Sequence, residues 1–168
     1  MKEVRTFSVD SQSGRIIVGR ILPGTDLIDG ILKICKEHGI ESGSIDVMLG
    51  SLMKFTFVYA VRDETKKLKA RYCEPVSIEG PLEFICGNGI IGKDDKEETA
   101  VHLHGMVSDE KQRIYAGHMV RGNPVLATIE IIIRELPDVD IKRELDEETG
   151  FPLFKFFKKR KLKCISRP

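Results

Sequence analysis

The pattern of apolar positions along the chain is typical of a protein built mainly of β-strands. Short segments alternate between apolar and polar side chains, or run apolar and β-branched, and polar clusters separate them. Strands are predicted over residues 4–9, 15–22, 45–60, 67–73, 76–78, 82–91, 100–107, 113–121, 125–136 and 140–145, and a bend near Gly50 and Ser51 is expected to divide 45–60 into two strands. We expect the first two to form an opening hairpin, and residues 79–81 to form a turn between two separate strands.

One segment departs from this pattern and predicts the main helix. Its apolar residues recur at helical spacing, at Leu27, Ile28, Ile31, Leu32, Ile34 and Cys35. Thr25 or Asp26 can cap the N-terminus, and Gly39 suits the left-handed position that ends a helix. Many strands and one helix predict an α+β fold, a single domain with a mostly antiparallel, curled β-sheet and one main flanking α-helix.

Two glycines lie inside one of the predicted strands. Gly87 and Gly89 interrupt the apolar run 82–91. Because a glycine inside a strand has no side chain to pack, it often marks a bulge or a close approach of another backbone. We expect one or the other here.

Three of the four histidines lie in the predicted hairpin formed by residues 100–107 and 113–121. His102 and His104 are two residues apart, so they share a face of their strand. If His118 pairs with either of them, all three imidazoles lie together, whereas a one-residue slip in register sends His118 to the other face. The alternative is a set of unrelated sheet histidines.

A patch of three imidazoles is suited to a divalent transition metal ion. Neutral imidazole nitrogen binds zinc at about 2.0–2.1 Å, and three protein ligands leave a fourth position open. We therefore predict a zinc site at His102, His104 and His118.

Length and composition are those of one soluble globular domain. The chain has 168 residues, of which 41% are hydrophobic and 32% charged. Its first ten residues lack the apolar core of a signal peptide, and no run is long enough to span a bilayer, so we expect a cytoplasmic protein with no membrane partner. The cysteines, Cys35, Cys73, Cys86 and Cys164, form no zinc-finger or disulfide spacing. We expect the first three to be buried free thiols.

Charge is unevenly distributed along the chain. Residues 151–168 carry seven basic and no acidic residues, so the net charge of +1 leaves −6 for residues 1–150. We expect a domain over residues 1–157 and a basic, flexible tail over residues 158–168. The candidate nucleic-acid-binding residues are Lys155, Lys158, Lys159, Arg160, Lys161 and Lys163. The alternative is a solvated tail without a partner.

Several short motifs, in order, resemble those of the PPC domain, also called DUF296. They are residues 20–27 (RILPGTDL), 38–40 (HGI), 43–45 (GSI), 49–51 (LGS), 79–84 (EGPLEF), 102–104 (HLH), 117–118 (GH) and 125–130 (VLATIE). The resemblance covers about residues 3–155. It implies an antiparallel sheet domain with one flanking helix that assembles as a homotrimer.

The resemblance also carries expectations about partners. Plant members join this domain to AT-hooks in nuclear DNA-binding proteins, whereas prokaryotic members commonly lack the hook and hold a metal through histidines. Those histidines fall here on His102, His104 and His118. The R-G-R-P core of the hook is absent, so the chain is similar to the AT-hook-less, metal-containing prokaryotic type.

These observations favour a metal-binding homotrimer that interacts with DNA as a regulatory protein. A first alternative is a hydrolase-type enzyme that uses the open metal position, with Glu83, Glu130 or Ser51 as general acid or base. A second alternative is a structural trimer that does not bind DNA and whose metal only ties elements together.

Overall fold

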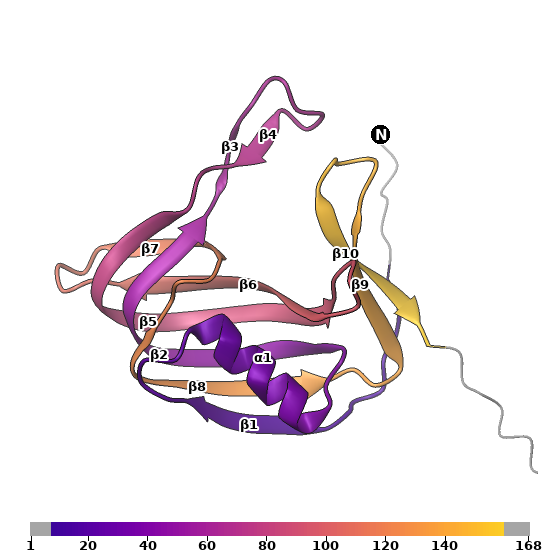
Figure 1. Cartoon of the computed structure of the whole chain (residues 1–168), viewed down its shortest axis with the longest axis horizontal. Coiled ribbons are helices and arrows are strands. Elements are labelled where there is room, and N and C mark those ends of the chain that lie inside the picture. Colours follow the sequence, from indigo (N-terminus) through magenta and orange to yellow (C-terminus); the bar gives the residue numbers. More distant parts are fainter. Residues whose placement is uncertain (1–7, 160–168) are drawn as a thin grey trace, which may run out of the picture.

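The computed structural model describes residues 8–159. Within them, eight strands form one large curled sheet, two more form a small ribbon, and one helix packs against the sheet (Figure 1). In chain order the elements are β1 (Ile16–Ile21), α1 (Leu27–His38), β2 (Gly43–Val58), β3 (Ala60–Arg62), β4 (Ala70–Tyr72), β5 (Val76–Lys93), β6 (Thr99–Ser108), β7 (Ile114–Met119), β8 (Val125–Glu135), β9 (Val139–Leu145) and β10 (Pro152–Lys158).

The long strand β2 causes the sheet to close on itself. It pairs with β5 along one side, and on the other side it pairs first with β8 and then, at Phe57 and Val58, with β7. β5 also pairs with β6, and β6 pairs with β7. The strands β2, β5, β6 and β7 therefore form a closed ring. The predicted curled, mostly antiparallel sheet is confirmed, but it is mixed, because β5 and β9 pair in parallel at Lys93 and Lys142.

One prediction about the strands lies mostly outside the described part, and another is wrong. Residues 1–7 of the expected opening hairpin are not described, residues 8 and 9 are not in a strand, and β1 pairs with β8. Residues 79–81 do not end a strand, because β5 continues through them. There the register with β2 shifts between Leu52 and Lys54, and Pro81, which lacks an N–H to donate, is tolerated at such an irregularity.

Helix α1 begins and ends where the sequence predicts. Asp26, rather than Thr25, is the N-cap, and its Oδ1 accepts hydrogen bonds from the backbone N–H of Ile28 (3.0 Å) and Asp29 (3.3 Å). Gly39 ends the helix with φ 64° in the left-handed region, which favours glycine. The apolar face of α1 is buried, and Leu27 is fully inaccessible to solvent.

The hydrophobic core lies between α1 and the concave side of the sheet. Its largest fully buried side chains are Phe55, Phe84, Leu27, Ile31, Ile45, Met48, Leu52, Leu82, Ile91, Leu103, Ile129 and Ile131. The helix is the only one in residues 8–159, and no helix there is long and apolar enough to cross a membrane.

The cysteines correct another prediction. Cys35 is buried as expected, and burial raises the pKa of its thiol to about 11. Cys73 is only partly buried and Cys86 is exposed. A bulge in β5 between Phe84 and Cys86 explains the second case, because it breaks the alternation that would have pointed Cys86 inward. Cys164 lies outside the described residues.

Two hairpin arms project from the body on the same side (Figure 1). One consists of β3 and β4, and the other of β9 and β10. They meet where the Lys67 ammonium donates a hydrogen bond to the Glu147 carbonyl oxygen (2.5 Å) and where the rings of Tyr72 and Phe151 contact edge to face at 5.8 Å. The contact between the arms places their aromatic residues beside the histidines of β6 and β7.

Candidate metal centre

The turn between β6 and β7 sets the register of the histidine hairpin. The Asp109 carboxylate accepts hydrogen bonds from the backbone N–H of Lys111 and Arg113, both at 2.9 Å. Beyond this turn Ser108 pairs with Ile114, and the register continues without a slip to His104 opposite His118. This is one of the two pairings that gather the histidines on one face.

The three imidazoles meet on that face. His102 Nε2 and His104 Nε2 are 3.2 Å apart, and one nitrogen from each of the three rings lies within 4.8 Å of the others. Three nitrogens bound tetrahedrally to one ion at about 2.0–2.1 Å would be separated by about 3.3 Å. The His102–His104 pair already has this spacing, and the His118 nitrogen lies within 4.8 Å of both.

The protonation state also suits a metal ligand. Burial, followed by the charges of His102, His104 and Arg143, lowers the pKa of His118 to about 4. Burial, His104 and Arg143 likewise lower the pKa of His102. Both rings are therefore neutral at physiological pH, which is the form that binds metals.

One buried atom at the site lacks a partner. His118 Nδ1 is inaccessible to solvent and has no hydrogen-bond partner within the described part of the chain. Buried polar atoms are nearly always satisfied, and leaving one unpaired costs about 1–3 kcal/mol. A metal ion bound to this nitrogen would satisfy it, so the residues present fit a metal ion.

Aromatic side chains from the two arms lie beside His102 and His118, whereas His104 is exposed. The Tyr72 ring of β4 lies 5.3 Å from the His118 ring, and the Phe154 ring of β10 lies 6.4 Å from the His102 ring. Together they enclose a cavity of about 40 Å³, lined by Tyr72, His102, His118, Arg143, Phe151, Pro152, Leu153 and Phe154. None of these residues has a carboxylate.

Close backbone packing beneath the histidines requires glycine. A Cβ atom on Gly89 would lie 2.4 Å from the carbonyl oxygen of His102, and one on Gly117 would lie 2.4 Å from the Phe57 ring. The close approach predicted for Gly89 is therefore confirmed. Gly87 is similarly crowded by the side chains of Met48 and Phe84. These contacts hold β6 and β7 against their neighbours.

The structure does not bring the candidate acids and bases to the histidines. Glu83 pairs with Ser108 near the far end of β6, and Glu130 lies on β8 beside Arg20 in a separate surface hollow. Ser51 accepts a hydrogen bond from the Ala127 backbone N–H. None of the three lines the histidine cavity.

The predicted nucleic-acid-binding residues divide into two groups. Lys155 pairs with Glu144, Lys158 with Asp10 and Asp138, and Lys159 with Glu41, at N–O distances of 2.9–3.6 Å. Arg160, Lys161 and Lys163 lie outside the described residues. The described lysines thus already have acidic partners.

Two residues of the site were not predicted from the sequence. Tyr72 reaches His118 only because the β3–β4 arm folds toward β7, and Arg143 reaches the cavity only because β9 pairs beside β5. The aromatic cluster near the C-terminus was a partial signal, since Phe151 and Phe154 anchor that segment against the histidines.

A sequence model of the Plants and Prokaryotes Conserved (PCC) domain matches residues 9–137. The chain belongs to the PCC domain family. The resemblance to the PPC domain is thereby confirmed. A PPC protein from Pyrococcus horikoshii has the same fold, with a TM-score of 0.74 and 26% identity over 91% of this chain and 99% of that one.

Two further structures share the PCC fold. The metal-containing protein from Archaeoglobus fulgidus has a TM-score of 0.76 and 23% identity, covering 89% of this chain and 99% of that one. A Bacteroides thetaiotaomicron protein, provisionally named a DNA-binding protein, has a TM-score of 0.71 and 21% identity, covering 87% and 97%. At this level of identity the likeness shows the fold alone.

A curated relative places the domain within a larger protein. The bifunctional protein GlmU of Synechococcus sp. (strain JA-3-3Ab) is 28% identical over 137 residues, which is 82% of this chain. The chain spans 20% of the length of that relative.

Proposed function

We propose that this PCC-domain protein binds one divalent transition metal ion, zinc in the first place, through His102, His104 and His118. The observation that carries the proposal is the cluster of three imidazole nitrogens within 4.8 Å of one another. In addition, Nδ1 of His118 is buried and has no hydrogen-bond partner among residues 8–159. The metal-containing relative from Archaeoglobus fulgidus, which shares the fold, supports it.

Ligand binding is better supported than hydrolysis at this site. A zinc ion with three protein ligands supplies a Lewis-acid centre with one position for an outside ligand. A hydrolase also needs a group that takes up a proton, and no carboxylate lines the cavity among residues 8–159. The side chains there instead orient and shield a ligand, with Tyr72 and Phe154 excluding water.

Zinc titration of matched variants tests the metal proposal. The wild-type protein is expected to retain one zinc ion per chain after dialysis, measured by elemental analysis, and His104→Gln and His118→Gln to lose it. His38→Gln is the control, because His38 is an exposed residue in the last turn of α1. Undiminished zinc in both His104→Gln and His118→Gln would refute the proposal.

Self-association is the second part of the proposal. β1, β2 and β8 present exposed apolar side chains to solvent, with Val18 76% exposed, Leu49 44% exposed and Leu126 37% exposed, and Arg20 and Glu130 lie among them. A surface hollow of about 480 Å³ lies on this face and is lined by Val18 and Leu49 among others. An exposed apolar patch of this kind commonly marks an interface, and we propose that it forms the homotrimer.

DNA is proposed as a partner of the basic C-terminal segment rather than of the metal centre. The net charge of +7 over residues 151–168 favours contact with phosphates, whereas the described lysines already have acidic partners. The full chain is expected to shift duplex DNA at low salt and not at high salt, and a chain ending at Lys159 to shift it much less. If the full chain does not shift DNA at low salt, DNA binding is refuted. The alternative of a structural trimer that does not bind DNA would then be favoured.

A further inference from the structure

Arg143 is exceptional among the arginines of the described chain. Seven others donate to a side chain: Arg15 to Glu135, Arg20 to Thr128, Arg62 to Glu64, Arg71 to Asp63, Arg113 to Asp109, Arg121 to Asp29 and Arg134 to Asp46. Arg143 alone has no hydrogen bond or ion pair from its side chain to any of residues 8–159. Arg143 is partly buried at the wall of a cavity, and an arginine there without a partner is suited to bind an anion.

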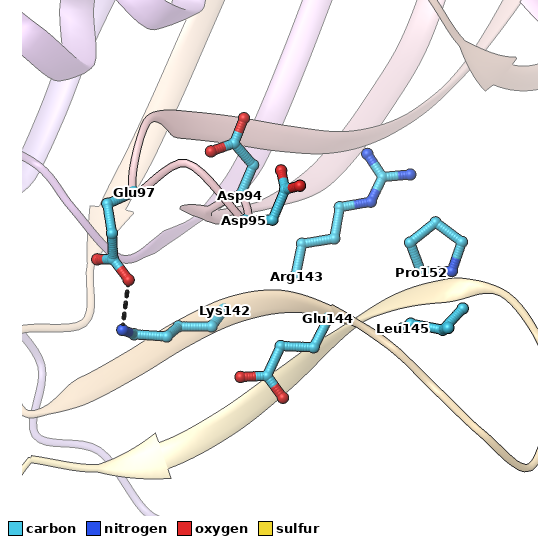
Figure 2. A pocket seen from close by; sticks show the side chains of 8 residues that line it. All are labelled: Asp94, Asp95, Glu97, Lys142, Arg143, Glu144, Leu145 and Pro152. Atoms are coloured by element: carbon cyan, nitrogen blue, oxygen red, sulfur yellow. Dashed lines mark hydrogen bonds and ion pairs between the residues drawn. The ribbon is translucent and has the colours of Figure 1, made fainter.

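The position of Arg143 connects the metal centre to the surface. It lines the 40 Å³ cavity together with His102 and His118. It also lines a cleft of about 810 Å³ outside the β9–β10 arm. Figure 2 shows Arg143 rising from β9 toward the loop of Asp94 and Asp95, with Pro152 on its other side.

The neighbouring acids are mostly engaged elsewhere. The Asp94 carboxylate accepts hydrogen bonds from the backbone N–H of Lys96 (2.9 Å) and Glu98 (3.0 Å). Glu97 pairs with Lys142 at 2.6 Å, the contact drawn in Figure 2. Asp95 is exposed on the loop.

The charge balance of the inner cavity calls for an anion. A divalent ion held by three neutral imidazoles keeps its charge of +2, and Arg143 adds +1. Among residues 8–159, none that lines this cavity has a carboxylate to offset the charge, and Asp94 and Glu98 lie in a separate hollow beside His118 and Arg143. The planar guanidinium presents two parallel N–H groups, which match the oxygens of a carboxylate or phosphate.

We propose that Arg143 and the metal ion together bind the anionic group of a small carboxylate or phosphate ligand. One oxygen of the group binds at the open metal position and another accepts from the Arg143 guanidinium. The inner cavity has room for little more than one such group, so the remainder of the ligand extends past Pro152 into the polar cleft. This inference rests on the metal site proposed above.

The test uses the full-length protein loaded with Co²⁺, whose visible absorption reports a change of ligand at the metal. Inorganic phosphate and acetate are titrated separately, and the anion that binds more tightly identifies the ligand class. Arg143→Gln is expected to weaken binding of that anion about 10–100-fold, the worth of a charged hydrogen bond. Arg143→Lys keeps the charge but loses the two parallel N–H groups, so its anion affinity is expected to lie between those of the wild type and Arg143→Gln. Arg62→Gln, on the exposed β3 arm, is expected to have the wild-type affinity.

The outcomes separate this inference from the metal proposal. Failure of the wild-type protein to take up Co²⁺ would overturn the metal site itself. One Co²⁺ per chain in both proteins, with equal anion affinity for wild type and Arg143→Gln, would overturn only the role of Arg143. One bound Co²⁺ whose spectrum responds to neither anion would also overturn it.

Discussion

His118 differs from a free imidazole in both of the properties that matter to a metal ligand. Its Nδ1 is buried without a hydrogen-bond partner in the described part of the chain, and burial together with the neighbouring histidines and Arg143 lowers its pKa to about 4. A ring in this environment is neutral at physiological pH without losing its lone pair to another hydrogen bond. The free-energy cost of burying this unpaired nitrogen is offset once a metal ion binds to it.

A first prediction concerns the pH dependence of the metal-free protein. In the unfolded chain His118 has its usual pKa near 6.5, so between about pH 6.5 and pH 4 the unfolded state takes up a proton that the folded state does not. Folding stability is therefore lost as the pH falls through this window and is unaffected by His118 above it. The melting temperature of the wild type is expected to fall more steeply than that of His118→Gln.

The comparison between the two proteins isolates this effect. Some carboxylates have pKa values lowered by ion pairs, such as Glu41 beside Lys93. Their contribution to folding stability is lost in acid to the same extent in the wild type and in His118→Gln. Parallel curves of melting temperature against pH for the metal-free wild type and His118→Gln would contradict the account of His118.

At the scale of elements, Asp26 joins α1 to the segment that follows β7. Its Oδ1 caps the helix, while its Oδ2 accepts hydrogen bonds from the backbone N–H of Gly122 and Asn123, both at 2.8 Å. Asn123 is fully buried and in turn accepts from the Thr56 N–H at 2.7 Å. This network ties the end of the histidine hairpin to the helix and to β2.

Removing this carboxylate is expected to be costly. Asp26→Ala should lower the free energy of unfolding by about 2–4 kcal/mol, because it removes a cap and leaves two further N–H groups unpaired. Asp26→Asn, which keeps one acceptor oxygen, should cost less. Asp29→Ala removes only an exposed pair with Arg121 and should cost less than about 1 kcal/mol. Equal losses for Asp26→Ala and Asp29→Ala in denaturant unfolding would contradict the structure.

The sequence predicts local elements better than their partners. The helix and the histidine hairpin follow from periodicity, caps and turn residues that lie within a few positions of one another. The two separate strands expected around residues 79–81 form one strand because Pro81 sits at an irregularity against β2, which no local signal reveals. Cys86 is exposed for a similar reason, since a bulge reverses the faces of β5.

The candidate site shows the same division. His102, His104 and His118 come from one hairpin, so two possible registers already gathered them, and the turn at Asp109 sets the one that forms. Tyr72 and Arg143 come from arms distant in the sequence. In the sequence, the residues next to them alternate between polar and apolar, as in any surface strand. Only the tertiary packing therefore identifies them as residues of the site.

At the scale of the whole molecule, the outward face of β1, β2 and β8 determines the proposed assembly. Val18→Glu and Leu49→Glu each place a charge on this face, and the wild type is expected to scatter light as three chains and the variants as one. Leu145→Glu, at a 66% exposed position on β9, is the control and should remain trimeric. Because these positions are exposed in the single chain, the variants should keep the wild-type circular dichroism. A trimer that persists in both face variants would contradict the proposed interface.

The central claim is that three histidines from one hairpin hold a metal ion with an open position. An anomalous difference map from crystals of the zinc-loaded protein, collected at the zinc absorption edge, tests it most directly. We predict one peak per chain, about 2.0–2.1 Å from a nitrogen of each of His102, His104 and His118. Zinc-loaded crystals with no peak at these histidines, or with the peak at another residue such as Cys86, would contradict it.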